Sequence, residues 1–576
     1  MRLVTTEYKV LQTNKVIEEI HDANFYVFAG KILPFDNDQT PPSPNNSVRQ
    51  SYYLANEDMI FAKRVTSDDV YPMIRRIDWE SEKVYDIYDD SDPNLHEKDF
   101  YVVSQEGPVY SVFKCLSNND GQPSIQRPLL SQTSASDELY QTTDGYIWKY
   151  IYSVDDFTFN RFSTSDFMPY EPDSDVENEA IEGTVDNMII IDGGVGYNVY
   201  TRGIVEQINV QGDSQRFFIQ GLDGVLSSNT NYYTDSGIYM TTGTAQGQFR
   251  KIVDYGSEQN NRFVQIEEDF SPMPSTTDEF EIAPHITIDG DGEDFVAKGS
   301  IDFDTNSIDN IDIINPGRGY SFGNVVVSSN TNTVSGITSS PADIRFVTSP
   351  QGGHGAYGQT ELFGYFLGIS VDFISNLLPS ANNEFRSFGI INNVKFPYAN
   401  LVLNDVENLE VGDEIEQYER FAKGEITSID TLTGEVELKD VEGVFEVENT
   451  LTSGETIDSV PFDFLNIDQR LKLDVNLVFE SGFQRGERVY QEETNAEGYV
   501  HEYNSGMLYL VNVRGQFKDE VGKAIIGDES SARANINSIK QPGIDKKESK
   551  ILYRENIQPV KRSNDQTERI KIVLGF

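Results

Sequence analysis

Two similar stretches, GDEIEQ at residues 412–417 and GERVYQ at residues 486–491, decide the fold of this chain. They lie 74 residues apart, and the same spacing relates residues 424–426 (GEI) to residues 498–500 (GYV). A set of turn glycines and apolar residues recurs 72 positions later, with Gly434, Val436, Leu438, Val441, Gly443 and Phe445 matched by Gly506, Leu508, Leu510, Val513, Gly515 and Phe517. Glycines in register mark turns, and alternating apolar residues mark one buried face of a strand. The pattern therefore predicts a tandem duplication of a small β-domain.

The sequence before the repeat also indicates strands joined by turns. Residues 188–191 (MIII) lead into GVGY at 194–197, and residues 311–314 (IDII) lead into GRGY at 317–320. In both places an apolar strand, a GxGY turn and a Val-rich strand follow one another, which predicts a repeated hairpin. Between them, the GTxxGQ turn at residues 243–248 precedes an alternation of apolar and polar residues. That alternation predicts another small β-module.

The first 183 residues combine a helix with several strands. Val10, Val16, Ile17 and Ile20 form an apolar stripe that predicts a helix. Strands are predicted at residues 24–28, 100–103, 109–115 and 146–154, with a loop over 35–51 and an acidic linker over 170–183. The whole chain is therefore expected to be mainly β with a few helices.

Length and composition support several folded domains. At about 100–200 residues per domain, 576 residues suggest about three to five of them. Hydrophobic residues make up only 38% of the chain, but 30 Tyr and 34 Phe supply bulk for cores. Wholesale disorder is therefore not expected.

The charge restricts the partners. A formal net charge of -49, spread along the chain, repels nucleic-acid phosphates and anionic lipid headgroups. The chain has no apolar run of about 18 residues and no recognisable signal peptide, so no membrane segment is expected. Cys115 is the only cysteine, which excludes an intramolecular disulfide and indicates assembly in a reducing cytoplasm.

The histidines give little support to a chemical site. His21, His96, His285, His354 and His501 show neither HExxH nor HxH spacing, so zinc binding is not indicated. His354 lies in the sequence GGHG at 352–355, which suits either a ligand or oxyanion loop or a tight turn before a strand at 362–371. We favour the turn, because a catalytic loop needs partner residues that the sequence does not identify.

Acidic and aromatic stretches are equally unspecific. Residues 289–294 (DGDGED) invite calcium, but an EF-hand loop needs Gly at its sixth position and Glu at its twelfth, where this chain has Asp294 and Ser300. An acidic hairpin loop is the simpler interpretation. The 94 acids offer too many carboxylate pairs for any one to indicate glycoside hydrolysis. The aromatic run at 24–28 (NFYVF) fits a core strand better than a sugar-stacking or base-stacking surface. We expect no catalytic, cofactor-binding or metal-binding residues.

Several islands of sequence resemble one family, the gene-eight type of baseplate wedge subunit in T-even-like contractile-tailed phages. They are residues 25–30 with the Pro-rich loop 34–47, 75–79 (RRIDW), 112–116 (VFKCL), 144–150 (DGYIWKY), 385–393 (FRSFGIINN) and 553–576 at the C-terminus. Both tryptophans, Trp79 and Trp148, fall inside these islands. The islands cover less than half of the chain, and the segments between them read as insertions that the T-even member lacks.

The resemblance implies a discontinuous β-sandwich core with inserted small β-domains. The core would comprise residues 1–175, 347–402 and 546–576, so that Trp148 and Phe576 share one domain. The insertions would be a β-domain with GxGY hairpin repeats at 183–346 and the two repeats at 403–475 and 476–545.

The resemblance also implies a function without bond-making chemistry. The chain would be a structural subunit of the virion, assembled in the host cytoplasm and present as two copies per wedge. It would bind other wedge subunits and transmit the rearrangement that triggers sheath contraction. The alternative is a host-facing tail module that binds or hydrolyses surface glycan, for which a fibre-tip position or a pair of close carboxylates in a groove would be the discriminating feature.

Overall fold

The computed structural model describes residues 4–576 except 21–23, 46–48, 133–138, 198, 223, 225, 330–338, 374–383, 418–420, 448, 479–481, 547 and 562–565. Strands dominate the described residues, with five short α-helices, so the predicted mainly β fold is confirmed. The chain folds into two compact units, unit 1 (residues 1–73 and 365–576) and unit 2 (residues 74–364). This division runs through the predicted core segment 1–175. Trp148 therefore lies in unit 2 and Phe576 in unit 1, although we expected them to share a domain.

Unit 1 is built on two sheets packed face to face. One sheet has the order β28-β2-β1-β22-β35, and the other contains β36, β21 and β3 as neighbours. Their bounds are β1 Tyr26–Gly30, β2 Met59–Arg64, β3 Val70–Arg75, β21 Phe366–Phe373, β22 Glu384–Asn392, β28 Asn466–Asp468, β35 Lys550–Lys561 and β36 Glu568–Gly575. Val27 and Phe61 of the first sheet share one buried cluster with Ile369 and Ile572 of the second. These strands come from four distant parts of the chain and form a discontinuous sandwich. One of them, β28, lies outside the segments that we expected to form the core.

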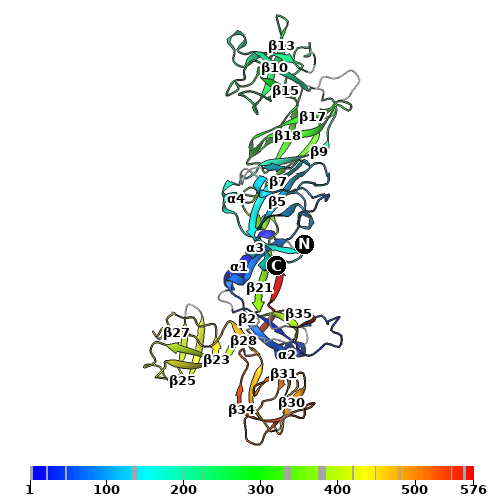
Figure 1. The fold of residues 1–576 in the computed structure, drawn as a ribbon. Coiled ribbons are helices and arrows are strands. Elements are labelled where there is room, and N and C mark those ends of the chain that lie inside the picture. Colours follow the sequence, from blue (N-terminus) through cyan, green and yellow to red (C-terminus); the bar gives the residue numbers. More distant parts are fainter. Residues whose placement is uncertain are drawn as a thin grey trace. The chain divides into compact units, whose positions relative to one another are not determined.

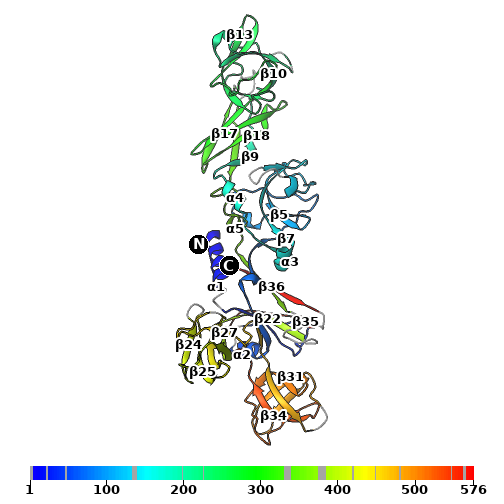
Figure 2. The same ribbon diagram turned by 60° about the vertical axis from the view of Figure 1, so that its left-hand side comes forward.

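Two α-helices belong to the described part of unit 1. Helix α1 (Thr6–Glu19) begins where the Thr5 hydroxyl accepts a hydrogen bond from the Tyr8 amide at 3.3 Å, and it confirms the predicted helix. Figures 1 and 2 show α1 beside β21, which it contacts. Helix α2 (Arg49–Glu57) begins inside the predicted 35–51 loop, because the Pro-rich stretch ends before it.

The predicted repeats form two β-modules in unit 1. The first contains β23 (Lys395–Leu403), β24 (Glu414–Gln417), β25 (Ala422–Asp430), β26 (Glu435–Glu442) and β27 (Ile457–Ser459), in the order β24-β25-β26-β23-β27. The second contains β29 (Leu471–Leu477), β30 (Arg488–Gln491), β31 (Glu497–Asn504), β32 (Met507–Arg514), β33 (Ile525–Gly527) and β34 (Arg533–Lys540). Its order, β30-β31-β32-β29-β34, follows that of the first module, and β33 closes it into a barrel.

The two modules also share the turns that the sequence pattern marks. Gly412 donates its amide to the Ile426 carbonyl at 2.9 Å, and Gly486 donates to the Val500 carbonyl at 2.7 Å. Both glycines have positive φ, at 101° and 84°, a conformation that disfavours other residues. Equivalent residues therefore form equivalent turns.

Unit 2 contains three further sheets and a barrel. Sheet β4-β5-β7-β6 comprises β4 (Tyr101–Glu106), β5 (Val109–Asn118), β6 (Leu139–Gln141) and β7 (Tyr146–Asp155). Sheet β18-β17-β16-β19 comprises β16 (His285–Gly290), β17 (Glu293–Asp302), β18 (Ser307–Arg318) and β19 (Gly323–Ser328), and β9 (Val185–Asp192) pairs with β20 (Asp343–Thr348). The remaining elements are β8 (Phe167–Pro169), α3 (Asp156–Phe162), α4 (Ser174–Glu179) and α5 (Gly358–Glu361). Four 3-10 helices cover Ser67–Asp69 in unit 1 and Leu95–Glu97, Leu130–Gln132 and Val210–Gly212 in unit 2.

The closed barrel of unit 2 is a third copy of the repeated module. It contains β10 (Thr201–Gln207), β11 (Arg216–Gly221), β12 (Gly237–Met240), β13 (Phe249–Glu258), β14 (Asn261–Ile266) and β15 (Glu279–Ala283). Its ring β12-β13-β14-β11-β10-β15 has the same order as β30-β31-β32-β29-β34-β33. The strand that ends the second module, β34, corresponds to β10, which begins the third, so the two are circular permutations. Asp235, with φ of 68°, replaces the turn glycine, and its backbone amide donates to the Ile252 carbonyl at 2.9 Å.

The GxGY motifs occupy equivalent positions but do not form hairpins. Among the described strands, β18 pairs with β17 and β19 with β16, while β9 pairs with β20. The expected hairpins are therefore not formed. Instead, each motif's tyrosine hydroxyl accepts a backbone hydrogen bond, Tyr197 from Ala342 at 3.0 Å and Tyr320 from Phe295 at 3.3 Å. The motif thus fastens the end of one strand to the strand paired with it.

Candidate functional site

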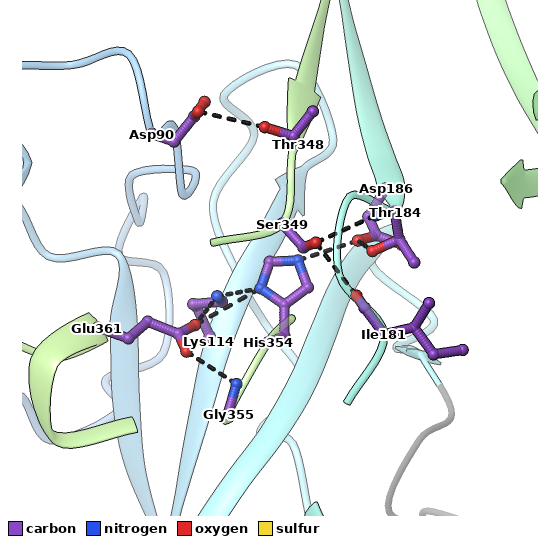
Figure 3. Close-up of polar contacts among 10 residues, drawn as sticks. All are labelled: Asp90, Lys114, Ile181, Thr184, Asp186, Thr348, Ser349, His354, Gly355 and Glu361. Atoms are coloured by element: carbon purple, nitrogen blue, oxygen red, sulfur yellow. Dashed lines mark hydrogen bonds and ion pairs between the residues drawn. The ribbon is translucent and has the colours of Figure 1, made fainter. Parts of the chain in front are cut away.

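Unit 2 contains a buried cluster of four ionisable side chains, shown in Figure 3. Lys114 comes from β5, Asp186 from β9, His354 from the loop before α5, and Glu361 from α5 itself. Their side chains are exposed by only 0%, 8%, 6% and 2% in that order. Buried charges are rare unless they are paired, so this cluster is the strongest candidate site that the described residues provide.

The four side chains form a continuous chain of contacts. The Lys114 ammonium contacts both Glu361 Oε1 and His354 Nδ1. On the other side of the ring, His354 Nε2 lies 2.9 Å from Asp186 Oδ2, which also accepts a hydrogen bond from the Thr184 hydroxyl at 2.8 Å. Glu361 Oε2 accepts the Gly355 amide at 2.8 Å. Every member therefore has at least two polar partners.

The surroundings determine the protonation of His354. Its Nδ1 faces the Lys114 Nζ and its Nε2 faces the Asp186 carboxylate, so the neutral tautomer with hydrogen on Nε2 satisfies both contacts. Burial, together with repulsion from Lys114, lowers the pKa of His354 to about 4. Burial also lowers the pKa of Lys114 well below its ordinary value. Burial alone would raise the pKa of Asp186, but the hydrogen bonds that its carboxylate accepts from His354 and Thr184 hold it below its ordinary value.

A second group of contacts fastens the same region. Arg345 on β20 donates both guanidinium nitrogens to Asp89, at 3.0 and 2.7 Å, and Thr348 donates to Asp90 at 3.2 Å. Ser349 donates to the Ile181 carbonyl at 3.3 Å and accepts the Thr184 amide at 3.1 Å. Arg345 and Thr348 thus join β20 to the segment that precedes β4, and Ser349 joins the end of β20 to the segment that precedes β9. Figure 3 shows the contacts of Thr348 and Ser349.

The arrangement of the cluster suits a structural anchor. A catalytic group must lie within about 3 Å of a place where a reacting atom can sit. Here Lys114 is fully buried, and both ring nitrogens of His354 are occupied by protein groups. The cluster instead ties β5, β9, the 349–357 loop and α5 together.

A cavity of about 750 Å³ adjoins this cluster, and Asp186 contributes to both. Its walls come from the ends of β5, β6 and β7 on one side and from β9 and β18 on the other. The volume falls within the range of about 300–1,000 Å³ that is typical of ligand sites.

The structure places the residues that the sequence singled out in separate environments. The loop residue His354 joins the buried cluster, in a turn made by Gly352, Gly353 and Gly355, all with positive φ. His285 is buried against Phe249, with ring centroids 4.9 Å apart, and His501 accepts from Arg470 at 3.1 Å. His96 is exposed beside Glu97, and His21 lies outside the described residues. Cys115 is buried and free.

The DGDGED sequence forms an acidic hairpin loop between β16 and β17. Asp291 accepts backbone hydrogen bonds from Ser321 at 2.9 Å and Phe322 at 3.1 Å, and the Ser321 side chain adds a third. These hydrogen bonds lower the pKa of Asp291 to about 2. Arg318 pairs with Glu293. The carboxylates of Asp291 and Glu293 are thus occupied by protein donors.

Sequence reasoning missed Lys114, Asp186 and Glu361. Lys114 carried a usable signal, because it interrupts the apolar run VFKCL of a predicted strand, and all residues from Ser111 to Leu116 are buried. Asp186 and Glu361 are two of 94 acids and had no such signal. Their partners lie 168 and 247 residues away in sequence.

The rest of the described chain gives few indications of function. In the described part of the chain, no group of three or more His, Cys, Asp or Glu side chains is placed to hold a metal ion. No helix within the same residues is long and apolar enough to cross a membrane. No protein-family model matches the chain, and no curated protein is similar to it.

Proposed function

We propose that this chain is a structural, non-enzymatic subunit of the baseplate wedge of a contractile phage tail. It contributes to baseplate assembly and transmits the rearrangement that triggers sheath contraction. Its partners are other wedge subunits and a second copy of itself. The proposal rests first on the sequence islands that resemble the gene-eight type of wedge subunit, among them residues 75–79 and 144–150.

The repetition of one β-module is the structural observation that carries the proposal. Three modules share a strand order, two in unit 1 and one in unit 2. The second and third modules each have their own buried core, and the core of the first is continuous with residues of β1 and β2. Catalysis needs a single group of side chains in a defined geometry. Repeated modules instead provide several similar surfaces that can contact other proteins. Such modules suit a subunit that contacts several neighbours in an assembly.

The buried cluster supports the same proposal. A subunit that transmits a rearrangement through its interfaces needs internally rigid parts, and the contacts of Lys114, His354 and Asp186 join segments that are far apart in the chain. Interiors packed in this way transmit strain rather than absorb it.

The decisive experiment is location in the particle. Antibodies against the full chain should label the baseplate end of contractile tails, and deletion of its gene should block baseplate assembly while other wedge proteins are still made. Labelling of fibre tips instead, or turnover of host polysaccharide that is lost on replacing a single carboxylate, would favour the glycan-directed alternative and contradict the proposal.

The expected two-copy contact has its own test. Two copies with a charge of -49 each repel one another, and the Debye length falls from about 10 Å at 0.1 M salt to about 3 Å at 1 M. Sedimentation should therefore show self-association that strengthens, or at least does not weaken, as salt rises. A monomer at every salt concentration, together with one copy per wedge in the particle, would contradict this part of the proposal.

A further inference from the structure

The cavity beside the buried cluster is bordered by the edges of three sheets. β6 ends the order β4-β5-β7-β6, β18 ends the order β18-β17-β16-β19, and β9 pairs only with β20 among the described strands. The Ile308 amide donates to the Gly193 carbonyl at 2.9 Å and so joins β18 to the end of β9. At the other end, the amides of Gly319 and Tyr320 donate to the carbonyls of Glu182 and Gly183 at 2.8 and 3.1 Å. Between these two attachments the described parts of β9 and β18 share no ladder.

The cavity faces strand edges rather than strand faces. Residues 186–190 of β9 and 308–313 of β18 line it without interruption. Side chains of a strand alternate between two faces, so a cavity against one face would be lined by every second residue. A continuous run indicates that the edge itself borders the cavity. In antiparallel ladders every second residue directs its N–H and C=O away from the paired strand, so both edges carry backbone groups that can bind another strand.

The lining combines apolar side chains with carboxylates. Met188, Ile190, Ile311 and Ile313 are half-buried there. The lining residues include four aspartates and no Lys or Arg. Alternating apolar side chains along an edge provide pockets for alternate residues of an added strand.

Two of these aspartates have no ion-pair or side-chain hydrogen-bond partner among the described residues. Asp186 pairs with His354, and Asp312 lies 3.6 Å from Lys298. By contrast, neither Asp120 nor Asp309 has an ion pair or side-chain hydrogen bond with any described residue, and both are exposed at the rim of the cavity. A ligand with positive charges would therefore complement the rim.

We propose that this cavity binds an extended segment of a partner protein in which basic and apolar residues alternate, added as a strand along the free edge of β18. The apolar side chains enter the cavity, and the basic side chains meet Asp120 and Asp309. The six consecutive lining residues 308–313 of β18 span about 20 Å at about 3.3 Å per residue, which sets the segment at about six residues. The inference concerns this chain alone and holds wherever the protein functions.

The test uses synthetic heptapeptides and the purified full chain. The probe alternates lysine and valine, with lysine at both ends, and a matched peptide carries glutamate in place of lysine. A third peptide has the lysine sequence with N-methyl groups on alternate backbone amides, which removes the strand hydrogen bonds. We expect the lysine peptide to bind at least about tenfold more tightly than either of the others, and amides of β9 and β18 to gain protection from hydrogen exchange only with it.

Charge reversal at the rim locates the binding. The double variant Asp120→Lys/Asp309→Lys should weaken binding of the lysine peptide by about tenfold or more. Glu206→Lys, an exposed change on β10 that does not line the cavity, is the matched control and should leave binding unchanged. Both variants change surface residues, and circular dichroism should show that both proteins fold.

Four results would overturn the inference. The first is equal binding of the lysine and glutamate peptides, and the second is binding that the rim reversal leaves unaltered. The third is full hydrogen-exchange protection of the β18 edge in the free chain. The fourth comes from a displayed library of random heptapeptides, if alternating basic and apolar sequences are not enriched on the wild-type chain relative to the rim variant. A glycan that competes for the cavity would likewise contradict a peptide ligand.

Discussion

Gln417 and Gln491 make the same pair of hydrogen bonds in two different modules. Gln417 donates to the Glu446 carbonyl and accepts the Glu446 amide, both at 3.0 Å. Gln491 donates to the Lys518 carbonyl at 2.6 Å and accepts the Lys518 amide at 2.8 Å. Both glutamines are buried and end the six-residue stretch that repeats in the sequence. In each module one side-chain amide thus holds the loop after the fourth strand in chain order, β26 or β32.

Replacing Gln491 by Ala should destabilise the second module. The change removes both side-chain hydrogen bonds to the Lys518 backbone, and two hydrogen bonds together contribute about 1–3 kcal/mol. Urea unfolding of the full chain, followed by hydrogen exchange of β29–β34, should show a loss of that size confined to this module.

Asp519→Ala provides the control for that change. Asp519 is exposed in the same loop and has no hydrogen bond or ion pair with a described residue, so its loss should alter the free energy of unfolding by less than about 0.5 kcal/mol. Equal effects of the two substitutions would mean that the glutamine does not hold the loop.

The same residues explain how far the sequence predicted the fold. The tandem modules were predictable because turn glycines and the terminal glutamine survive in both copies. In the third module Asp235 stands in place of the turn glycine and Met240 in place of the glutamine, and the chain enters the ring at a different strand. What that copy retains is a set of backbone hydrogen bonds, which many sequences can form. Sequence comparison therefore gave a small β-module there without its relation to the other two.

The candidate site was even less predictable from the sequence than the fold was. Lys114 stood out only as a charge within an apolar strand, and the GxGY hairpins were wrong because local turn chemistry does not specify which strands pair. Strand order depends on contacts between distant segments, such as β9 with β20, which are about 150 residues apart.

Replacing only one residue of the Lys114–Glu361 pair should cost more stability than expected from the effect of replacing both. Lys114→Met or Glu361→Met alone leaves a buried group without its partner, which costs about 3–5 kcal/mol. The double variant Lys114→Met/Glu361→Met removes both groups and should be less destabilised than the sum of the single changes. Chemical denaturation of the four proteins gives the coupling energy.

The exposed pair Lys439–Glu425 is the control for that cycle. Both side chains are more than 40% exposed, so the coupling energy should be only about 0–1 kcal/mol. A coupling for Lys114 and Glu361 no larger than this would contradict the anchoring role of the cluster.

Gly353→Ala should loosen the loop that carries His354. Gly353 has φ of 103°, and an added Cβ would lie 2.6 Å from backbone atoms of Ile181. We expect a loss of about 1–3 kcal/mol and faster hydrogen exchange in the 349–357 loop. Gly107→Ala is the control, because Gly107 also has positive φ but open space around its Cβ position. If both changes cost the same, the close approach to Ile181 contributes nothing.

Acid should destabilise unit 2 through His354. The pKa of this buried ring is lowered from 6.5 to about 4, first by burial and then by Lys114. Below about pH 6.5 the unfolded chain therefore takes up a proton that the folded chain does not, until the pH reaches about 4. The free energy of unfolding should fall over this interval, by up to about 3 kcal/mol at 1.36 kcal/mol per pH unit, and show no such dependence above pH 7. His285, whose pKa burial also lowers to about 4, acts in the same direction.

Urea unfolding at pH 7.5, 6.0 and 5.0 measures this dependence. His354→Gln should lower stability at pH 7.5, because the contacts with Lys114 and Asp186 change, yet its stability should fall less steeply with acid than that of the wild type. His96→Gln is the control, because it replaces another histidine of unit 2 whose side chain is 42% exposed and lies outside the cluster. A His354→Gln protein as steeply acid-sensitive as the wild type would show that His354 does not resist protonation in the folded chain.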